Sequence, residues 1–460
     1  MARRIIREGK LQSQSNVAGI TRITVGGFKS IYPEQSIEIK PLTILAGANS
    51  SGKSSMIQPL LLLKQTLDST YDPGALLLNG PNVKFTRADQ LLSRTIDKKT
   101  INDFYVGAQV GSEIGLTTYF IQGKNKEKGF EVGQTIHNVD KQEYRLSKGM
   151  SQEEIVAILT AILAPFQDLF NDNERERLRN QISHPQKAGV SLVQYRCFLT
   201  LDITSLGLLV PHQLMNDEII VGDHIRQTLH LPGLRGSPER DYPATAAGPT
   251  FPGTFELYAA SIIEQWQLDK DKQKLMRLFN DLARLALTNK VVAERKNATA
   301  IELLVNRLLH GNKEDMVSIA DVGIGVSQAL PVVVALHTAE PGQLVYIEQP
   351  EIHLHPRAQY AMAEVLANAA KEGKRLVIET HSSLLLLGIQ TLMAEGKLPP
   401  ELVKLYWFTQ QEDGSTKIDS ADLDERGTYG DWPEDFDDIA LYTENRFLNA
   451  QARMRGPADE

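Results

Sequence analysis

Cysteine is almost absent from this sequence: Cys197 is the only one among 460 residues. A single thiol excludes an intramolecular disulfide framework, so nothing here requires an oxidising compartment. Long apolar runs are also missing, because the longest, such as Leu330–Leu336 and Leu384–Ile389, are too short to cross a bilayer. Residues 1–18 contain no apolar core of signal-peptide length, so we expect a mobile polar leader there. These absences predict a cytoplasmic protein without a membrane span.

An excess of positive charge is missing as well. The net charge is −8 and the isoelectric point about 5.8, whereas a protein that coats nucleic acid over its whole surface is normally basic. The hydrophobic fraction of 42% and the charged fraction of 23% are those of a globular protein, which excludes collagen-like and disordered chains. Any contact with DNA must therefore be local. The basic residues that could make such a contact are Arg3, Arg4, Arg7, Lys10, Arg175, Arg177 and Arg179.

The spacing of apolar residues changes along the chain and divides it into five parts. Short β-branched runs, with alternation between residues 102 and 147, predict antiparallel strands within 19–148. A period of 3.6 then predicts a mainly helical insertion over 149–300. Strand and helix patterns alternate afterwards, which is typical of a parallel sheet with crossover helices. We expect the leader at 1–18, a head whose halves are 19–148 and 301–400, the insertion at 149–300, and a C-terminal strand with an acidic and aromatic cap at 401–460.

A phosphate-binding loop is the most specific motif. Residues 47–54 match G-x-x-x-x-G-K-[ST] at every fixed position, after an apolar strand and before an apolar helix. The backbone N–H groups of such a loop bind phosphate oxygens, a lysine reaches the β and γ phosphates, and a serine hydroxyl binds Mg²⁺. We expect Lys53 to face solvent. The predicted nucleotide-binding residues are Gly47, Ala48, Asn49, Ser50, Ser51, Gly52, Lys53, Ser54 and Ser55.

An acidic strand supplies the second half of the predicted site. Leu344–Ile347 has the pattern of a buried strand and ends in Glu348, which Gln349 and Glu351 follow. An apolar strand with acids at its carboxyl end places carboxylates beside Mg²⁺ and the γ phosphate, so we expect Ser54 and Glu348 to hold the metal. About 295 residues separate Lys53 from Glu348, which indicates a large insertion between the two halves.

Two further segments complete the pattern. Residues 377–380 form an apolar strand that ends at His381, which suits a γ-phosphate sensor, although a histidine there can also be structural or a metal ligand. Upstream, a Gly-x-Gly-x-Ser segment at a helix N-terminus offers N–H groups and a hydroxyl to an anion. The same sequence pattern also occurs at the start of an ordinary capped helix. Its candidate residues are Gly323, Gly325, Ser327 and Gln328.

His353 and His355 alternate in a way that suits two zinc ligands on one face of an extended segment. No cysteine lies near them, and His381 is the only other local histidine. We therefore favour packing of this loop against the nucleotide site of a partner subunit.

The segments GANSSGKSS, VGIGVSQALP, IEQPEIHLHP and IETHSS, in this order, resemble the ABC-type ATPase heads of the RecF, SMC and OLD lineage. The likeness is strongest to single-chain bacterial ATPases of anti-phage defence loci, such as the ATPase subunits of Septu-like and retron-associated systems. It implies an α/β fold: an ABC-type P-loop NTPase head with an antiparallel β subdomain and an inserted helical lobe.

The resemblance also implies cofactors and partners. ATP and Mg²⁺ would lie at the interface of a homodimer or higher oligomer, with Gly323, Gly325, Ser327 and Gln328 acting in trans. A separate effector, a nuclease or a toxin, is the implied partner of an ATPase switch. The alternatives are a DNA-repair or chromosome-maintenance ATPase that clamps DNA, and a nucleotide-binding scaffold with little turnover.

The chain departs from the lineage in its acidic strand. The lineage usually ends this strand in Asp-Glu-Pro and uses the second acid as the general base, whereas Gln349 stands in that place here. An amide cannot take a proton, so either Glu351 substitutes or hydrolysis is slow. The catalytic residues implied are Glu348, Gln349, Glu351 and His381.

The C-terminal part is rich in acids, which admits two interpretations. One is a metal-dependent nuclease; the other, which we favour because Pro, Gly and Trp are interleaved, is a solvated acidic loop. The acids concerned are Asp422, Asp424, Glu425, Asp431, Glu434, Asp435, Asp437 and Asp438.

Overall fold

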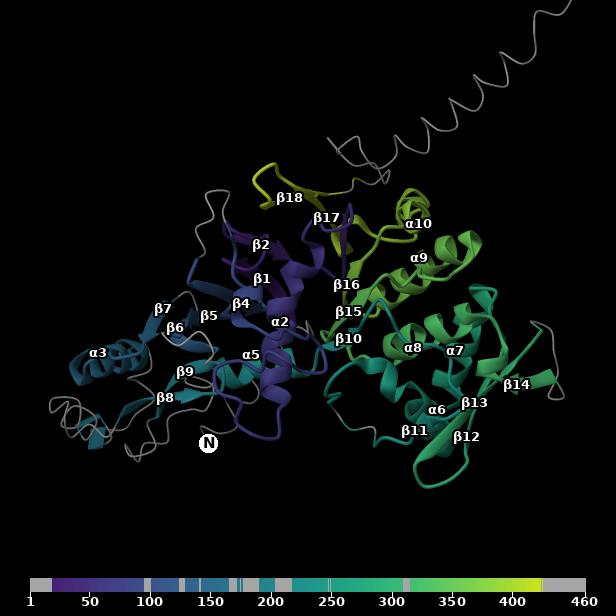
Figure 1. Ribbon diagram of the computed structural model, residues 1–460, viewed down its shortest axis with the longest axis horizontal. Coiled ribbons are helices and arrows are strands. Elements are labelled where there is room, and N and C mark those ends of the chain that lie inside the picture. Colours follow the sequence, from purple (N-terminus) through teal and green to yellow (C-terminus); the bar gives the residue numbers. More distant parts are fainter. Residues whose placement is uncertain are drawn as a thin grey trace, which may run out of the picture.

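A computed structural model describes most of the chain (Figure 1). The described residues are 19–94, 101–123, 129–139, 142–164, 172–173, 175–176, 190–202, 217–246, 248, 250–308, 315–422 and 424. The predicted leader, Arg177, Arg179 and the acids from Glu425 onward lie outside these residues. None of the described helices is both long and apolar enough to cross a membrane.

A mostly parallel sheet lies at the centre of the molecule (Figure 1). Only its last strand pairs antiparallel with its neighbour. In spatial order the strands are β10 (Leu229–Leu231), β15 (Leu344–Glu348), β16 (Arg375–Glu379), β3 (Leu42–Gly47), β17 (Val403–Gln410) and β18 (Thr416–Ala421). Because β3, β15 and β16 are parallel, their carboxyl ends meet at one edge of the sheet.

A second, antiparallel sheet covers one face of this centre. The antiparallel strands expected between residues 102 and 147 are confirmed as successive neighbours in this sheet, and helix α2 (Lys53–Asp68) packs against β1, β3 and β4. The strands are β2 (Gln35–Glu38), β1 (Ile20–Gly26), β4 (Asp103–Val110), β5 (Ile114–Gln122), β6 (Phe130–Val139) and β7 (Gln142–Ser147). Pro59 does not interrupt α2, which runs for 16 residues with Pro59 buried.

The remaining helices and short strands form two flanking regions. Near the β8–β9 hairpin lie α3 and α5, and on the opposite face of the central sheet lie α6 to α10 with a small sheet (Figure 1). The helices are α3 (Gln152–Leu163), α5 (Asp217–Arg226), α6 (Ala259–Leu268), α7 (Lys272–Arg284), α8 (Ile324–Thr338), α9 (Pro356–Lys371) and α10 (Ser383–Ala394). The strands are β8 (Ser191–Tyr195), β9 (Phe198–Asp202), β11 (Tyr242–Pro243), β12 (Val291–Arg295), β13 (Ala300–Asn306) and β14 (Met316–Ser318).

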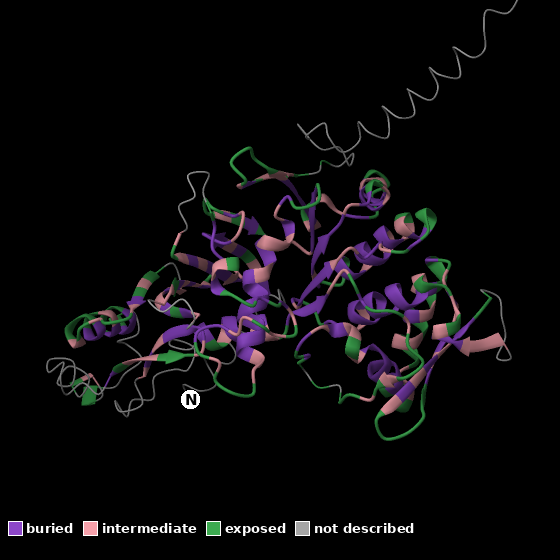
Figure 2. Ribbon diagram, viewed as in Figure 1, coloured by how far each residue is buried: buried purple, intermediate pink, exposed green. Residues whose placement is uncertain are grey.

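The period of two along a strand gives the central sheet two apolar faces. Its strands are largely buried (Figure 2). Leu42 and Ile44 of β3 enter the core formed with α6 to α10. Leu45, between Ile44 and the loop, enters the other core with α2 and the antiparallel sheet. The sheet is therefore buried on both sides, which fixes the positions of its strand ends.

The insertion expected at 149–300 differs from the structure in its makeup. Leu229–Leu231 forms β10, which extends the central sheet beyond β15, and the boundary at 300 divides the β12–β13 hairpin. Three residues are too few to show strand periodicity, so the spacing of apolar residues did not indicate this strand. The C-terminal strand expected after residue 401 is confirmed, since residues 403–410 pair in parallel with β3 and belong to the central sheet.

Candidate functional site

At two positions in the loop between β3 and α2, the backbone has a conformation that only glycine tolerates. Gly47 and Gly52 have φ angles of 139° and 102°. A Cβ atom at Gly52 would lie 2.1 Å from Thr416 Oγ1, and one at Gly47 would lie 2.3 Å from the Phe408 carbonyl oxygen. Both contacts come from the β17–β18 hairpin, so this hairpin presses against the loop.

Lys53 does not face solvent, contrary to expectation. It is 3% exposed, and its Nζ donates hydrogen bonds to the carbonyl oxygens of Gly47 (3.1 Å) and Ala48 (2.8 Å). Burial lowers the pKa of Lys53, and the nearby carboxylate of Glu379 raises it in part. Lys53 is buried because its ammonium group turns back onto its own loop instead of extending into solvent.

Ser54 meets a carboxylate that the sequence analysis did not single out. Its Oγ donates to Glu379, at 3.0 Å from Oε1 and 2.9 Å from Oε2. Tyr346 Oη also donates to Glu379 Oε2 at 2.8 Å. Glu379 is 7% exposed, and burial raises its pKa. Its only sequence signal was its place at the end of an apolar strand, which it shares with Glu348.

Glu348 lies one strand farther from the loop and contacts other groups. His230 Nε2 is 3.1 Å from its Oε1, and the Gly233 N–H donates to its Oε2 at 3.2 Å. Burial would raise the pKa of Glu348, but these hydrogen bonds bring it below its ordinary value. Ser54 contacts Glu379 and not Glu348, because β16 lies between β15 and β3. The expectation that Ser54 and Glu348 hold Mg²⁺ stays a prediction.

Gln349 and Glu351 lie in the turn that follows β15. Gln349 has a φ of 46°, and its N–H donates to the carbonyl oxygen of Glu379 at 2.7 Å. Glu351 is buried, and its Oε1 accepts from Thr380 Oγ1 (2.7 Å) and from the N–H of His381 (3.0 Å). Burial raises the pKa of Glu351, and its Oε2 has no hydrogen-bond partner in the structure. Glu351 thus ties the turn after β15 to the end of β16.

His381 comes next to the phosphate-binding loop, where its sequence position suggested it would be. Burial and the charge of Lys53 lower the pKa of its imidazole, while a hydrogen bond to the backbone of Gly47 opposes that change. The site therefore combines Lys53, Ser54, Glu379 and His381 at one edge of the sheet.

The Gly-x-Gly-x-Ser segment begins α8, with Gly323 as its N-cap residue. Gly323 is exposed and has open space around it, whereas Gly325 packs closely against the carbonyl oxygen of His353. Ser327 Oγ donates to the Ile324 carbonyl oxygen at 2.9 Å, as serine often does within a helix. Gln328 is 3% exposed and its Nε2 donates to the Gly236 carbonyl oxygen at 2.7 Å, so it faces the interior instead of a partner.

Arg235 links this helix to the acidic turn. Its Nη2 donates to the carbonyl oxygens of Glu348 (2.7 Å) and Gln349 (3.2 Å), and its Nη1 donates to that of Gln328 (3.3 Å). Arg235 is buried, which lowers its pKa to about 10, so it keeps its charge at neutral pH. It is a positioning residue for both segments.

The two histidines considered as zinc ligands have other surroundings. His355 Nδ1 accepts from the Arg357 N–H at 3.3 Å and caps α9. His353 is exposed with a φ of 61°. Within the described ranges, the one group of three possible metal ligands is His137, Asp217 and Glu218, which lies elsewhere. The loop packs on the α8 N-terminus of its own chain.

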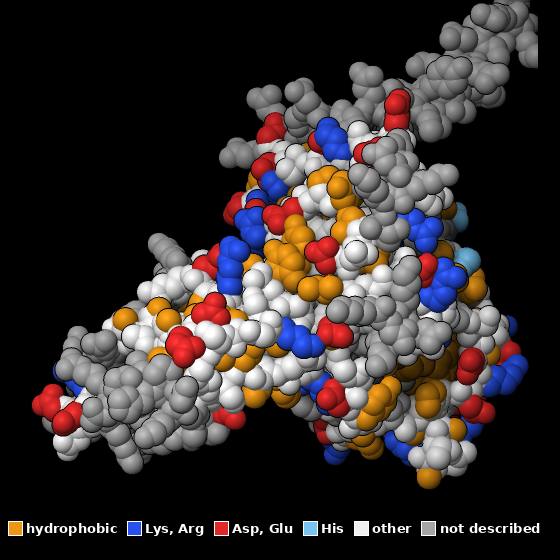
Figure 3. Space-filling view, turned by 60° about the vertical axis from the view of Figure 1, so that its left-hand side comes forward, with side chains coloured by type: hydrophobic (Ala, Val, Ile, Leu, Met, Phe, Trp, Pro, Cys, Tyr) orange, Lys and Arg blue, Asp and Glu red, His pale blue; other side chains and the backbone are white. Residues whose placement is uncertain are grey.

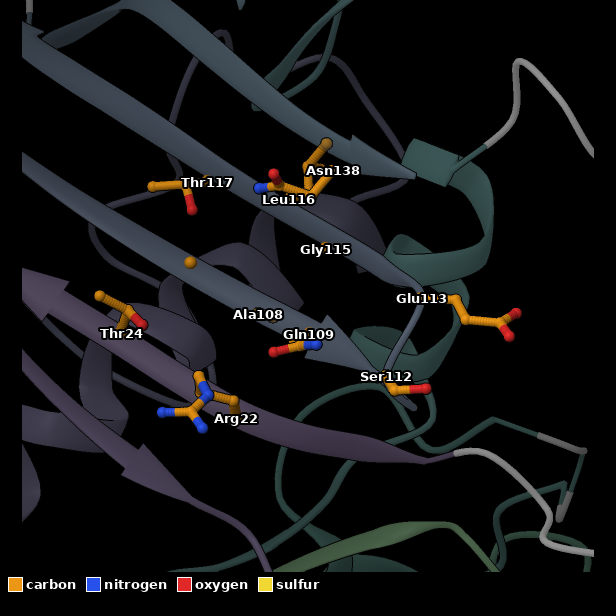
Figure 4. Close-up of a pocket in the computed structure, with 11 residues that line it drawn as sticks. Arg22, Thr24, Ala108, Gln109, Ser112, Glu113, Gly115, Leu116, Thr117 and Asn138 are labelled. Carbon is orange, nitrogen blue, oxygen red and sulfur yellow. The ribbon is translucent and has the colours of Figure 1, made fainter. Parts of the chain in front are cut away.

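A cavity of about 350 Å³ lies on the antiparallel sheet, away from this site (Figure 4). Small residues form its floor, and Arg22, Gln109 and Glu113 stand around it. All of its lining residues come from β1, β4, β5, β6 and the turn at 111–113. It is therefore separate from the phosphate-binding loop.

Most of the chain matches one family of known proteins. Residues 42–387, about three quarters of the chain, match the family described as "AAA domain, putative AbiEii toxin, Type IV TA system". No curated protein matches.

Several solved structures are similar over most of the chain at low identity. An SMC head bound to the C-winged helix domain of ScpA has 13% identity and a TM-score of 0.49, and covers 88% of this chain and 98% of that chain. An SMC head from Pyrococcus furiosus has 11% identity and a TM-score of 0.46, with coverages of 94% and 100%. The SMC head from Thermotoga maritima has 10% identity and a TM-score of 0.39, with coverages of 88% and 100%.

The family match spans the phosphate-binding loop, the α8 N-terminus, the acidic strand and His381. The expected α/β fold class is confirmed: a mostly parallel central sheet with an antiparallel subdomain, in a chain that matches an AAA-domain family. The chain belongs to the AAA-domain family whose description names the AbiEii toxin.

Proposed function

We propose that this protein binds ATP with Mg²⁺ at the loop 47–54 and hydrolyses it slowly. The observation that carries the proposal is the convergence of Lys53, Ser54, Glu379 and His381 at the carboxyl edge of three parallel strands. This is where nucleotides bind to open α/β sheets.

The residues present fit a nucleotide. Gly47 and Gly52 let the backbone curve so that its N–H groups and the N-terminus of α2 can bind phosphate oxygens. Lys53 supplies a buried positive charge, and Ser51 Oγ is buried without a hydrogen-bond partner in the structure. An orphaned buried hydroxyl in such a loop fits a ligand oxygen.

The residues also fit Mg²⁺, which binds oxygen ligands and keeps several waters. When bound, the ion would neutralise charge on the transferred phosphoryl group. Gln349 can orient a water through its amide but cannot accept a proton, and Glu351 is engaged by two donors. Gln349 is therefore no base, and one oxygen of Glu351 is tied to the end of β16 while the other has no hydrogen-bond partner in the structure; this fixed placement supports slow basal turnover.

Dimerisation and partners form the finer part of the proposal. Exposed Gly323 at the start of α8 offers N–H groups to a nucleotide bound by a second copy. The ATP-dependent pair would act as a switch for a separate effector, a nuclease or toxin, in defence against phage. On the face drawn in Figure 3, basic and acidic side chains are interspersed, and this pattern gives no support to a DNA clamp.

The binding step is tested by titrating ATP into the Lys53→Ala variant. We expect the affinity to fall at least about tenfold, because a charge-assisted contact to phosphate is lost. Since Lys53 is buried, thermal melting must show that the variant is folded. Lys397→Ala, which removes an exposed lysine paired with Glu395, is the matched control. Equal affinity in both variants contradicts the assignment of this loop.

A further inference from the structure

We propose that His137, Asp217 and Glu218 bind one divalent transition-metal cation, foremost Zn²⁺, at a site that takes no part in nucleotide binding. His137 lies on β6, and Asp217 and Glu218 are the first two residues of α5. Each of the three offers a nitrogen or oxygen atom, and these atoms all lie within 4.8 Å of one another. Strand β6 and helix α5 are far apart in sequence, so the fold itself brings this cluster together (Figure 1).

The burial of two acids beside one histidine is the first argument. His137, Asp217 and Glu218 are 1%, 3% and 6% exposed. A buried carboxylate needs a positive partner or a full set of hydrogen bonds. Among the described residues, the only ion-pair partner of either acid is His137. One imidazolium cannot neutralise two carboxylates, whereas a divalent cation can.

An unused ligand atom is the second argument. Oε2 of Glu218 is buried and has no hydrogen-bond partner in the structure. A buried carboxylate oxygen without a donor loses its hydration and gains no contact in return. Because the Glu218 carboxylate belongs to the cluster with His137 and Asp217, a cation bound there would satisfy it.

The orientation of the imidazole is the third argument. His137 Nε2 lies 2.9 Å from the Leu199 carbonyl oxygen, which can only accept, so Nε2 carries a hydrogen. Metal-binding histidines typically donate their second ring N–H to such a carbonyl group. The ring of Tyr144 stacks on the imidazole with centroids 4.8 Å apart and planes 10° apart, which fixes its plane. Nδ1 is thereby directed at Asp217.

The contact between Nδ1 and Asp217 needs a positive charge between its atoms. His137 Nδ1 lies 2.7 Å from Asp217 Oδ2, and two lone pairs at this distance repel unless a proton or a cation lies between them. Protons fill this role in the absence of metal, and a bound cation displaces them. Two ligands of a tetrahedral zinc ion are about 3.3 Å apart, so the first turn of α5 would withdraw by roughly half an ångström.

The ligand types select the class of cation. Mg²⁺ and Ca²⁺ prefer oxygen ligands alone, whereas one imidazole nitrogen with two carboxylates suits Zn²⁺ and its neighbours among the transition metals. Three protein ligands leave one position of a tetrahedral ion for a water. The bound ion would join the antiparallel sheet to the start of α5. The end of α5 is held separately, where the Arg226 carbonyl oxygen accepts from Lys64 Nζ of α2 at 2.6 Å.

Zinc affinity of the full chain tests the proposal. Protein treated with a chelator is titrated with Zn²⁺ against a chromophoric competitor, in excess Mg²⁺ so that oxygen-only sites are filled. We expect one Zn²⁺ per chain, bound at least about tenfold more weakly by Glu218→Gln and by Asp217→Asn, because each substitution removes a charged ligand. Wild-type affinity in Glu218→Gln overturns the proposal.

Asp281→Asn is the matched control for this titration. His337 Nε2 lies 2.8 Å from Asp281 Oδ2, so the pair resembles that of His137 and Asp217. It has no third possible ligand among the residues that the structure describes. We therefore expect the wild-type zinc affinity in Asp281→Asn, and a loss equal to that of Glu218→Gln overturns the proposal.

Anomalous X-ray scattering at the zinc edge tests the site without any variant, which matters if a substitution in this buried cluster prevents folding. Wild-type crystals grown with Zn²⁺ should show a peak about 2.0–2.2 Å from His137 Nδ1 and from a carboxylate oxygen of both acids. The absence of a peak at this position overturns the proposal. Neither measurement depends on nucleotide, so its outcome is independent of the proposed ATP binding.

Discussion

Glu348 and Glu379 end neighbouring strands in register, yet their carboxylates have different partners. Glu379 meets the hydroxyl groups of Ser54 and Tyr346, and Glu348 meets His230 and the N–H of Gly233. Two buried acids so close together repel each other, and the charge of Glu348 contributes to the raised pKa of Glu379. A divalent cation beside Ser54 would relieve that repulsion.

Gln349 is the residue whose replacement tests why turnover is slow. Gln349→Glu should raise basal ATP hydrolysis about tenfold, because a carboxylate at this position can accept the proton of the attacking water. The measurement is the rate of phosphate release at saturating ATP. An unchanged rate, with ATP affinity also unchanged, would show that this position does not hold the base.

A pair of variants shows whether Glu351 is the general base or a residue that positions His381. Glu351→Gln keeps an oxygen that can accept from Thr380 Oγ1 and His381 N–H, whereas Glu351→Ala removes both bonds. If Glu351 positions His381, we expect Ala to cost about 1–3 kcal/mol of unfolding free energy and Gln to preserve most of the turnover. Loss of turnover in the stable Gln variant would instead identify Glu351 as the base.

At the scale of elements, the β17–β18 hairpin supports the phosphate-binding loop. Thr416 Oγ1 donates to the Ser51 carbonyl oxygen at 2.8 Å, and the Thr416 N–H donates to the Ser30 carbonyl oxygen at 2.7 Å. The loop is therefore held from behind by a segment more than 360 residues away in sequence. This contact is a reason why the loop geometry depends on the complete head.

Gly52→Ala tests this support. The added Cβ meets Thr416 Oγ1 at 2.1 Å, and the residue must keep a φ of 102°, so we expect a loss of at least about 2 kcal/mol in unfolding free energy. Gly414→Ala is the matched control, because its φ is 81° but nothing lies within 4 Å of its Cβ. Urea unfolding of both variants checks this. Equal losses would mean that the hairpin does not press on the loop.

A second element contact joins α5 to the antiparallel sheet through buried charges. His137 Nδ1 lies 2.7 Å from Asp217 Oδ2, and Glu218, next to Asp217, is also buried. Burial would lower the pKa of His137, but the bond to Asp217 raises it above its ordinary value. Burial and the charge of Asp217 raise the pKa of Glu218 to about 7.

Both shifts make the folded protein less stable as the pH rises. The folded state holds protons that the unfolded state has already released, so this stability is present below the unfolded pKa values and is lost through the folded ones. We expect the unfolding free energy to fall between pH 5 and pH 8, and Glu218→Gln to remove up to about 3 kcal/mol of that fall. Denaturant melts at both pH values measure it, with exposed Glu153→Gln as the control. A pH dependence that Glu218→Gln leaves unaltered would contradict the assignment.

At the scale of the whole molecule, the sequence predicted the motifs at the edge of the central sheet better than the short edge strand β10 and the contacts between distant segments. The loop 47–54, the acidic strand and His381 carry dense local signals, and the structure brings them to one sheet edge. Leu229–Leu231 is too short to show a period, and Glu379 acquires its place only through strand order, which no local pattern reveals. The burial of Lys53 and Gln328 likewise arises from segments distant in sequence.

The burial of the residues at the start of α8 decides which substitution can test the pairing of two copies of the chain. Ser327 is buried, so a large residue there would disturb the fold itself. Gly323 has open space around it and a φ of −60°, which any residue can adopt. Gly323→Arg therefore blocks the start of α8 toward a partner while leaving the fold of its own chain intact.

Mixing the Lys53→Ala and Gly323→Arg proteins tests the central claim most directly, since the claim is that ATP joins Lys53 of one copy to the α8 N-terminus of another. Each variant alone should hydrolyse almost no ATP. In an equal mixture half of the dimers are mixed and each holds one intact site, so about a quarter of wild-type turnover should return. If no mixing ratio restores activity, although both variants are folded and the wild-type protein is active, ATP does not bind between two copies in this way.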